Sequence, residues 1–253
     1  MTEFTISHSG LKDFLSSFGK DLADLVIEAK SDGIHASVGK DTHFIRRKVE
    51  CDVSQSGKVN ISDLSKVKAF MGTMKSGDLK ITQSGKASTL HIVGPSSSLQ
   101  LPTSSYIQSQ DKVGLMSRLI REAEESMWQK WAGFPLKYHA KVTAESLKPA
   151  SKFSKVVGSK FSCKTEFDPQ GAELVIRGGS SSKGKMFVRA PLIDIESPDI
   201  SARSAFDYWL PELLENLPSG ELDIHTGDES VIVLKQVSTD FLMVVIDQEY
   251  EED

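Results

Sequence analysis

Apolar residues recur at helical spacing in four segments of the chain, residues 10–22, 63–75, 147–157 and 207–217. In the first segment Leu11, Phe14 and Phe18 fall on one face, as the core-facing stripe of an amphipathic helix does. Ser62 is a suitable N-cap for the second helix, and Pro149 is tolerated in the first turn of the third. The pattern therefore predicts four short helices, each packed through one face.

Between these helices, alternating and continuous apolar runs predict strands. In the first half these are residues 4–7, 25–30, 34–38, 44–53, 58–61, 79–82, 90–92 and 99–101, with a hairpin turn at Asp32-Gly33. In the second half they are residues 138–144, 161–167, 173–177, 186–195, 201–206, 219–224, 231–237 and 241–247. Strands follow one another and outnumber the helices, which predicts an α+β fold with antiparallel sheets.

One turn sequence occurs twice, as Ser76-Gly77-Asp78-Leu79-Lys80-Ile81 and as Ser219-Gly220-Glu221-Leu222-Asp223-Ile224. Each copy follows a predicted helix and opens a hairpin. The order β-α-β-β-β-β-α-β-β fits both halves, so we expect one architecture used twice. The predicted domains are residues 1–103 and 138–253, joined by a connector at 104–137 that contains a helix at 113–131.

The bulk composition is ordinary for a soluble globular protein, with 39% hydrophobic and 26% charged residues in a chain of 253. The sequence has no apolar run of about 18 residues and no signal-peptide core, so we expect a cytoplasmic protein, in the bacterial host if a phage encodes it. The six histidines lack ligand spacing, and Cys51 and Cys163 are isolated. We therefore predict no metal, no cofactor and no disulfide.

Lysines gather on the faces of the first three helices, although the net charge of the chain is −5. On a helical projection Lys148, Lys152 and Lys155 fall within about 60° of one another. A compact ammonium group suits phosphate, and these faces carry no aromatic or amide side chain that reads bases. The alternative is that they are ordinary solvated faces. The lysines concerned are Lys12, Lys20, Lys66, Lys68, Lys75, Lys148, Lys152 and Lys155.

The repeated unit, the lysine-bearing faces, the long connector and the acidic tail Tyr250-Glu251-Glu252-Asp253 together resemble a DNA sliding clamp. The relatives are the two-domain protomers of proliferating cell nuclear antigen and the clamps of tailed phages. The segment from Asp32-Gly33-Ile34-His35 to Thr42-His43-Phe44 is similar to the one that carries their partner-pocket loop, and residues 241–249 to their last strand. The resemblance covers nearly the whole chain except residues 113–131.

This resemblance implies a non-catalytic ring of six domains, hence a homotrimer, with duplex DNA held in the central hole without sequence specificity. The eight lysines would face the phosphates. DNA polymerase and clamp loader would dock peptides in a pocket formed by His43, Phe44, Phe134, Leu136, Ser230, Val245, Ile246 and Tyr250. The fourth helix departs from the pattern, because it carries Glu212 and Glu215 where a basic face is expected.

Other interpretations stay open on the sequence alone. A viral structural or assembly protein that forms rings or sheets would not depend on the lysine faces, and a hydrolase site that forms only in the folded chain is a third possibility. The run Gly179-Ser180-Ser181-Ser182-Lys183-Gly184-Lys185 matches a phosphate-binding loop, but Met186 and a strand follow, so we predict a hairpin. For Trp128 and Trp131 packing is favoured over base stacking.

Overall fold

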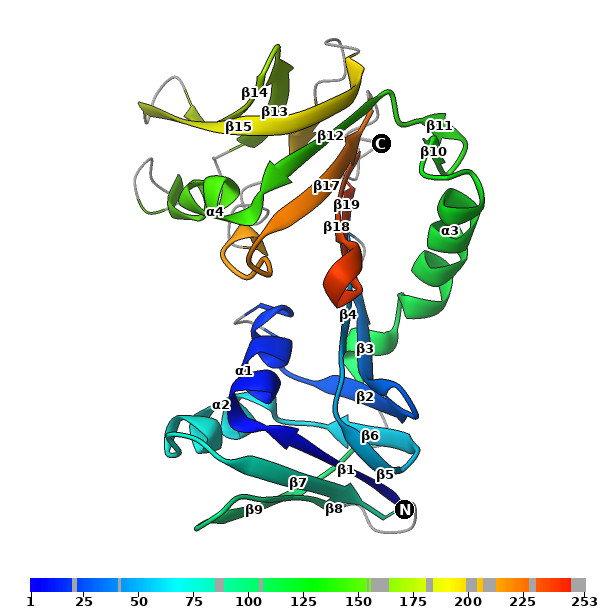
Figure 1. Cartoon of the computed structure of the whole chain (residues 1–253), viewed down its shortest axis with the longest axis vertical. Coiled ribbons are helices and arrows are strands. Elements are labelled where there is room, and N and C mark those ends of the chain that lie inside the picture. Colours follow the sequence, from blue (N-terminus) through cyan, green and yellow to red (C-terminus); the bar gives the residue numbers. More distant parts are fainter. Residues whose placement is uncertain are drawn as a thin grey trace, which may run out of the picture. The chain divides into compact units, whose positions relative to one another are not determined.

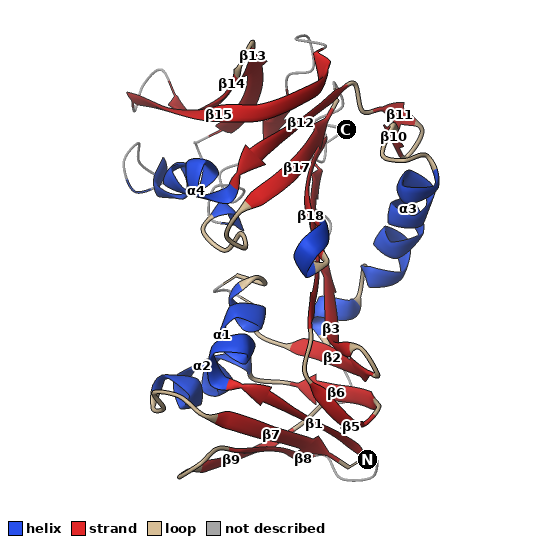
Figure 2. Cartoon of the chain, in the orientation of Figure 1, coloured by secondary structure: helices blue, strands red, loops and turns tan. Residues whose placement is uncertain are grey.

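Antiparallel strands build most of the protein in our computed structural model, which describes residues 1–19, 22–40, 42–84, 89–104, 107–153, 155, 164–180, 184–198, 204–206, 213–227 and 231–246. The chain divides into two compact units (Figures 1 and 2). Unit 1 contains Met1–Lys40, Ile45–Gly114 and Ser238–Phe241, and unit 2 contains Asp41–Phe44, Leu115–Val237 and Leu242–Asp253. The predicted α+β class is confirmed. Among the described residues, no helix has the length and apolarity needed to cross a membrane.

Unit 1 begins with strand β1 and helix α1, and β1 belongs to the antiparallel sheet β5-β1-β7-β8-β9. A second group of strands pairs β3 with β2 and β2 with β6. The elements are β1 (Thr2–Ser7), α1 (His8–Ser16), β2 (Leu25–Lys30), β3 (Gly33–Gly39), β4 (His43–Val49), β5 (Asp52–Gln55), β6 (Gly57–Ile61), α2 (Leu64–Gly72), β7 (Asp78–Gln83), β8 (Thr89–Val93), β9 (Ser98–Pro102) and the 3₁₀ helix η1 (Gln108–Gln110).

Unit 2 carries the connector helix and a run of antiparallel strands in the order β16-β13-β14-β15-β12-β17-β18-β19. Its elements are α3 (Val113–Glu125), which starts at the end of unit 1, β10 (Lys130–Trp131), β11 (Phe134–Pro135), β12 (Tyr138–Thr143), α4 (Ala144–Leu147), η2 (Lys148–Lys152), β13 (Lys164–Gln170), β14 (Glu173–Ser180), β15 (Gly184–Pro198), β16 (Ser204–Phe206), β17 (Glu221–Thr226), β18 (Val231–Gln236), η4 (Val237–Thr239) and β19 (Phe241–Ile246). The pairing of Ser180 with Gly184 confirms the predicted hairpin.

The repeated turn plays the same structural part in both units. The carbonyl oxygen of Gly77 accepts a hydrogen bond from the N–H of His8, at the start of α1, over 2.8 Å. The carbonyl oxygen of Gly220 accepts one from the N–H of Ala144, at the start of α4, over 2.9 Å. Both glycines have positive φ, 112° and 104°, which glycine adopts without steric penalty. The predicted repeat is thus confirmed, because in each unit the turn accepts a hydrogen bond from the first residue of the helix that follows β1 or β12.

Several predicted boundaries are wrong. The helix expected at 10–22 spans His8–Ser16, and Asp63 rather than Ser62 caps α2, because its carboxylate accepts from the N–H of Lys66 at 3.0 Å. The connector helix ends at Glu125 instead of 131, since Met127 and Trp128 have positive φ. The strand predicted at 44–53 is split between β4 and β5. Of the helix predicted at 207–217, residues 207–212 lie outside the described residues.

The helix predicted at 147–157 is not one regular α-helix. A single α-helical turn, α4, passes into the 3₁₀ helix η2, whose second residue is Pro149. Proline has no N–H to donate, so it cannot take part in the regular helical hydrogen-bond ladder. Phe153 then packs directly over the backbone of Gly178 on β14, where a Cβ atom would overlap its ring. This contact fixes the segment on the sheet.

Candidate functional site

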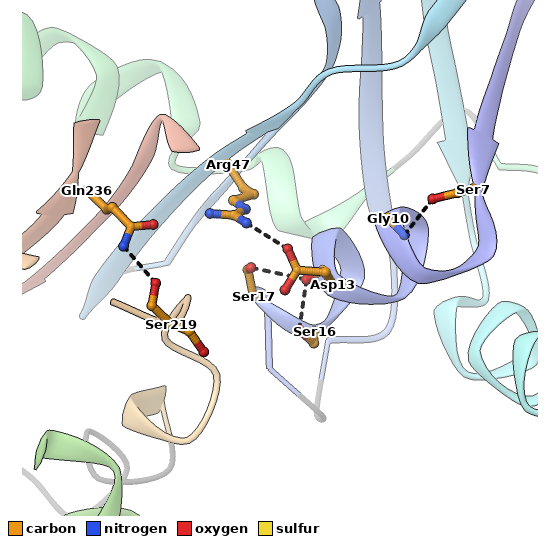
Figure 3. A network of polar contacts seen from close by, with 8 residues as sticks. All are labelled: Ser7, Gly10, Asp13, Ser16, Ser17, Arg47, Ser219 and Gln236. Atoms are coloured by element: carbon orange, nitrogen blue, oxygen red, sulfur yellow. Dashed lines mark hydrogen bonds and ion pairs between the residues drawn. The ribbon is translucent and has the colours of Figure 1, made fainter. Parts of the chain in front are cut away.

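Helix α1 presents Lys12 to solvent because its other face is buried. Ser7 caps the helix, with its hydroxyl accepting from the N–H of Gly10 at 3.0 Å (Figure 3). Leu11, Phe14 and Leu15 are buried against the body of unit 1, which leaves Lys12 exposed. Lys20, the second lysine predicted for this helix, lies outside the described residues.

Asp13, beside Lys12, has a structural partner. Its carboxylate accepts from the guanidinium of Arg47 on β4 over 2.7 Å (Figure 3). Arg47 is buried, and its Nε and Nη1 atoms have no hydrogen-bond partner within the described part of the chain. The carboxylate of Asp13 therefore balances the buried charge of Arg47. Lys12 contributes an exposed positive charge to the solvent-facing side of α1.

Helix α2 places its predicted lysines in different surroundings. Lys66 is exposed and pairs with Asp63 over 3.0 Å, while Lys75, beyond the end of the helix, is exposed. Lys68 is half-buried, and its ammonium donates to the carbonyl oxygen of Gly19 over 2.7 Å. Because that bond ties α2 to the segment after α1, Lys68 serves the fold and is less accessible than the other two.

The third predicted lysine face is only partly as expected. Leu147, Ala150 and Phe153 are buried, so Lys152 and Lys155 are exposed, whereas Lys148 is half-buried. In a 3₁₀ helix residues four apart are separated by about 120°, so Lys148 and Lys152 do not share the narrow sector predicted from α-helical geometry. In the fourth segment Glu215 is exposed opposite buried Leu214 and Leu217, and Glu212 lies outside the described residues.

The residues predicted for a partner pocket are mostly core residues. Phe44, Val245 and Leu136 are buried, His43 is nearly so, and Ile246 is half-buried. The N–H of Ile246 donates to the carbonyl oxygen of Thr42 over 3.0 Å, which brings the end of β19 to the start of β4. Among the described members of this set, Phe134 alone is an exposed side chain, and Ser230 and Tyr250 fall outside the described part of the chain.

The sequence analysis did not predict a stack of three aromatic rings in unit 2, those of His139, His225 and Trp128. His139 and His225 are directly paired across β12 and β17, and Trp128 stacks on His225 with ring centroids 5.9 Å apart. The ammonium of Lys235 lies 5.8 Å from the centre of the Trp128 ring. Burial, followed by the charges of His139 and Lys235, lowers the pKa of His225 to about 3. The pairing of the two histidines could have been predicted from the repeated turn. In the antiparallel register that pairs Thr143 with Glu221, His139 lies opposite His225.

A cavity of about 430 Å³ lies between the end of α3 and the β10–β11 hairpin, which was also not predicted. Its lining consists of Glu122, Ala123, Glu125, Ser126, Lys130, Ala132 and Gly133. Trp128 and Trp131 are buried, so the predicted packing role of this pair is confirmed.

The described residues offer little to metal or thiol chemistry. They contain no group of three or more His, Cys, Asp or Glu side chains arranged to hold a metal ion. Burial raises the pKa of the Cys51 thiol to about 11, so the thiol stays protonated and unreactive at neutral pH. Cys163 lies outside the described residues. What the arrangement does offer is exposed ammonium groups on short helices of both units, suited to phosphate.

Neither a protein-family model nor a curated protein sequence matches the chain. Solved structures do match it. The A. fulgidus PCNA, solved with the C-terminal region of FEN-1, aligns over 100% of both chains with a TM-score of 0.68 and 14% identity. The chain has the sliding-clamp fold. The predicted fold is therefore confirmed over the full length of the chain.

Two further clamps show the same fold. The PCNA of Thermococcus kodakaraensis has a TM-score of 0.68 and 16% identity over 98% of this chain and 100% of its own. A putative DNA polymerase III beta subunit from Eubacterium rectale has a TM-score of 0.72 and 11% identity over 98% of this chain. The chain spans 66% of the length of that beta subunit, whereas it matches the whole PCNA protomer.

Proposed function

We propose that the chain is a non-catalytic sliding clamp that encircles duplex DNA and tethers a replicative DNA polymerase. The observation that carries this proposal is the placement of exposed lysines on short helices of both units, within a fold that matches PCNA over its whole length. Lys12, Lys66, Lys75, Lys152 and Lys155 are the exposed members. Ammonium groups spread over several helices favour phosphate contacts that do not depend on base sequence.

We extend the proposal to the remaining lysines, the domains, the partners and the compartment. We assign Lys20, Lys68 and Lys148 secondary roles on the DNA-facing side, and we place the domains at 1–103 and 138–253 with the connector between them. The partners are a DNA polymerase and a clamp loader, and the compartment is the cytoplasm. The A. fulgidus PCNA binds the C-terminal region of FEN-1, which supports peptide docking as the mode of partner recognition.

Two open strand edges support closure into a ring of three chains. Strand β9 is the last strand of its sheet and pairs with β8 on one side. Residues 184–191 of β15 pair with β14, whereas β12 pairs only with the later part of β15. Phe187, on this first part, is 55% exposed. An edge strand has unpaired backbone N–H and C=O groups that can pair with another chain. Pairing of β9 with β15 of the next copy would continue the sheet and cover Phe187.

The mass in solution tests the ring. Light scattering over a concentration series should give a mass near three chains, and Phe187→Glu should lower it to that of a monomer. Val237→Glu adds the same charge at an exposed apolar residue that belongs to neither β9 nor β15, and should leave the mass unchanged. A dimer, or a trimer that persists in Phe187→Glu, would contradict this closure.

Primer extension tests the function itself. A polymerase supplied with clamp and loader should copy long templates, and the products should shorten when the clamp is omitted. Equal product lengths with and without the protein would refute the clamp and favour an assembly protein that forms rings for another purpose.

A further inference from the structure

The segment that follows α3 is folded back sharply on itself. Of the non-glycine residues with positive φ in the described chain, three lie here, Met127 (53°), Trp128 (61°) and Ala132 (48°). Gly133 adds a fourth positive φ at 90°. Such conformations persist where the surrounding structure holds them in place, because L-residues rarely adopt them.

Buried tryptophans and backbone hydrogen bonds hold this segment. Trp128 and Trp131 are buried, and the N–H of Trp128 donates to the carbonyl oxygen of Ala123 over 2.8 Å. The N–H of Leu136 donates to the carbonyl oxygen of Gln129, also over 2.8 Å, which closes the base of the β10–β11 hairpin. The hairpin and the end of α3 therefore keep a fixed geometry around the cavity of about 430 Å³ between them.

Two large apolar side chains that are exposed to solvent belong to residues next in sequence to the cavity lining. Met127 follows the lining residue Ser126 and is 76% exposed, and Phe134 follows the lining residue Gly133 and is 48% exposed. A rigid segment anchored by two buried tryptophans would gain free energy by burying these side chains as well. Exposed apolar groups grouped around a cavity are typical of a binding surface.

The charged residues that line the cavity indicate what kind of ligand fits it. Glu122 and Glu125 on α3 line it and are exposed, and neither forms an ion pair within the described residues. Lys130 is the one cation in the lining. The two carboxylates thus outnumber the cation, so an occupant with a positive charge is complementary to this wall.

We propose that the cavity between α3 and the β10–β11 hairpin is a docking site for a short peptide that carries a basic side chain next to a large apolar one. The basic group pairs with Glu122 and Glu125, and the apolar group packs on Met127 and Phe134. That the peptide belongs to a replication protein rests on the proposed clamp function, whereas the binding itself does not. The site lies within one unit and shares Phe134 with the partner pocket predicted around Phe44 and Val245, but none of the residues that line the cavity belongs to that pocket.

The test uses the full chain and a phage-displayed library of random twelve-residue peptides. Selected sequences, made as fluorescent synthetic peptides, are titrated with the protein in fluorescence polarisation. We expect enrichment of a basic residue beside Leu, Ile, Met or Phe. Glu122→Gln with Glu125→Gln should weaken binding about tenfold, the effect of losing ion pairs at a partly desolvated site. Phe134→Ser should weaken it by about tenfold or more.

Glu124→Gln is the matched control, because this glutamate is exposed on the same helix but does not line the cavity. It should bind the peptides as the parent does, and the cavity variants should melt at the parent temperature. A failure to select peptides, or peptides whose affinity is unchanged by both cavity variants, overturns the proposal. Since no DNA or polymerase is present, a chain that binds the peptides but fails in primer extension would refute the clamp function alone.

Discussion

The imidazole rings of His139 and His225 lie stacked, with centroids 4.0 Å apart and planes inclined by 12°. The Nδ1 atom of His139 lies 2.8 Å from the carboxylate of Glu196 on β15. His225 is 3% exposed, and its Nε2 atom has no hydrogen-bond partner among the residues that the structure describes. A proton on His225 would therefore be buried beside His139 and Lys235.

This pair makes unit 2 sensitive to acid. The pKa of His225 is about 3 in the folded chain, below its ordinary value of 6.5, because burial disfavours the cation and His139 and Lys235 add repulsion. Below pH 6.5 the unfolded chain therefore binds the extra proton, and stability is lost as the pH falls toward 3. The loss should reach ~2 kcal/mol by pH 5.

Urea denaturation between pH 4 and 7.5 measures this loss. His225→Phe keeps a flat ring in the stack and removes the titrating group, so its stability should depend less on pH over the same range. An unchanged pH dependence in His225→Phe would show that other groups cause the acid sensitivity.

The repeated turn should not tolerate a side chain. A Cβ atom at Gly77 would lie 2.5 Å from Cγ of Pro95, and the φ of +112° is already unfavourable for alanine. We expect Gly77→Ala to lower the free energy of unfolding by about 2 kcal/mol. At Gly72, on α2, no atom lies within 4 Å of the added Cβ. Gly72→Ala should therefore raise the free energy of unfolding by roughly 0.5 kcal/mol. Thermal melts of the two variants should shift in opposite directions.

The ion pair of Asp13 and Arg47 is expected to behave as a unit. Asp13→Ala leaves the buried guanidinium of Arg47 without its carboxylate, which should destabilise the chain by about 2 kcal/mol. Adding Arg47→Met removes the orphaned charge and should restore most of that loss. A double-mutant cycle by chemical denaturation measures the coupling. Additive effects of the two substitutions would mean that the pair contributes no interaction of its own.

The lysines should separate into two classes. Lys152→Glu with Lys155→Glu should reduce duplex DNA binding in low salt, since both side chains are exposed, and leave the melting temperature unchanged. Lys68→Met removes the bond to the carbonyl oxygen of Gly19 and should lower stability by about 1 kcal/mol. Lys40→Glu, an exposed lysine outside the helices, is the control for the change in charge. Equal DNA binding by all the variants would contradict the lysine assignment.

The sequence pattern correctly predicted those helices and turns that are determined by residues close together in the sequence. The stripe of Leu11, Phe14 and Phe18 identified α1, and the repeated turn identified the relation between the two units. The end of α3 could not be predicted in this way, because the stripe of apolar residues continues past Glu125. The helix ends where Trp128 turns to stack on His225, almost a hundred residues further along the chain.

The site was predicted less completely, for a similar reason. Residue type identified the lysines, but exposure depends on tertiary contacts, and Lys68 is half-buried because Gly19 lies within reach of its ammonium group. The cavity beside Glu122 and Glu125 needs the β10–β11 hairpin, whose strands are two residues long. Runs that short carry no periodicity to detect.

The turns at Gly77 and Gly220 also bear on the order in which the chain folds. Each joins a strand to one much later in the sequence, Ser7 to Asp78 and Thr143 to Glu221. Closing loops of that length costs chain entropy before any contact is gained, and pairings between distant residues slow folding. The start of α1 and the start of α4 gain their backbone acceptors only after the late strand has arrived. In each unit the lysine-bearing helix should therefore be secured late, after most of the sheet has formed.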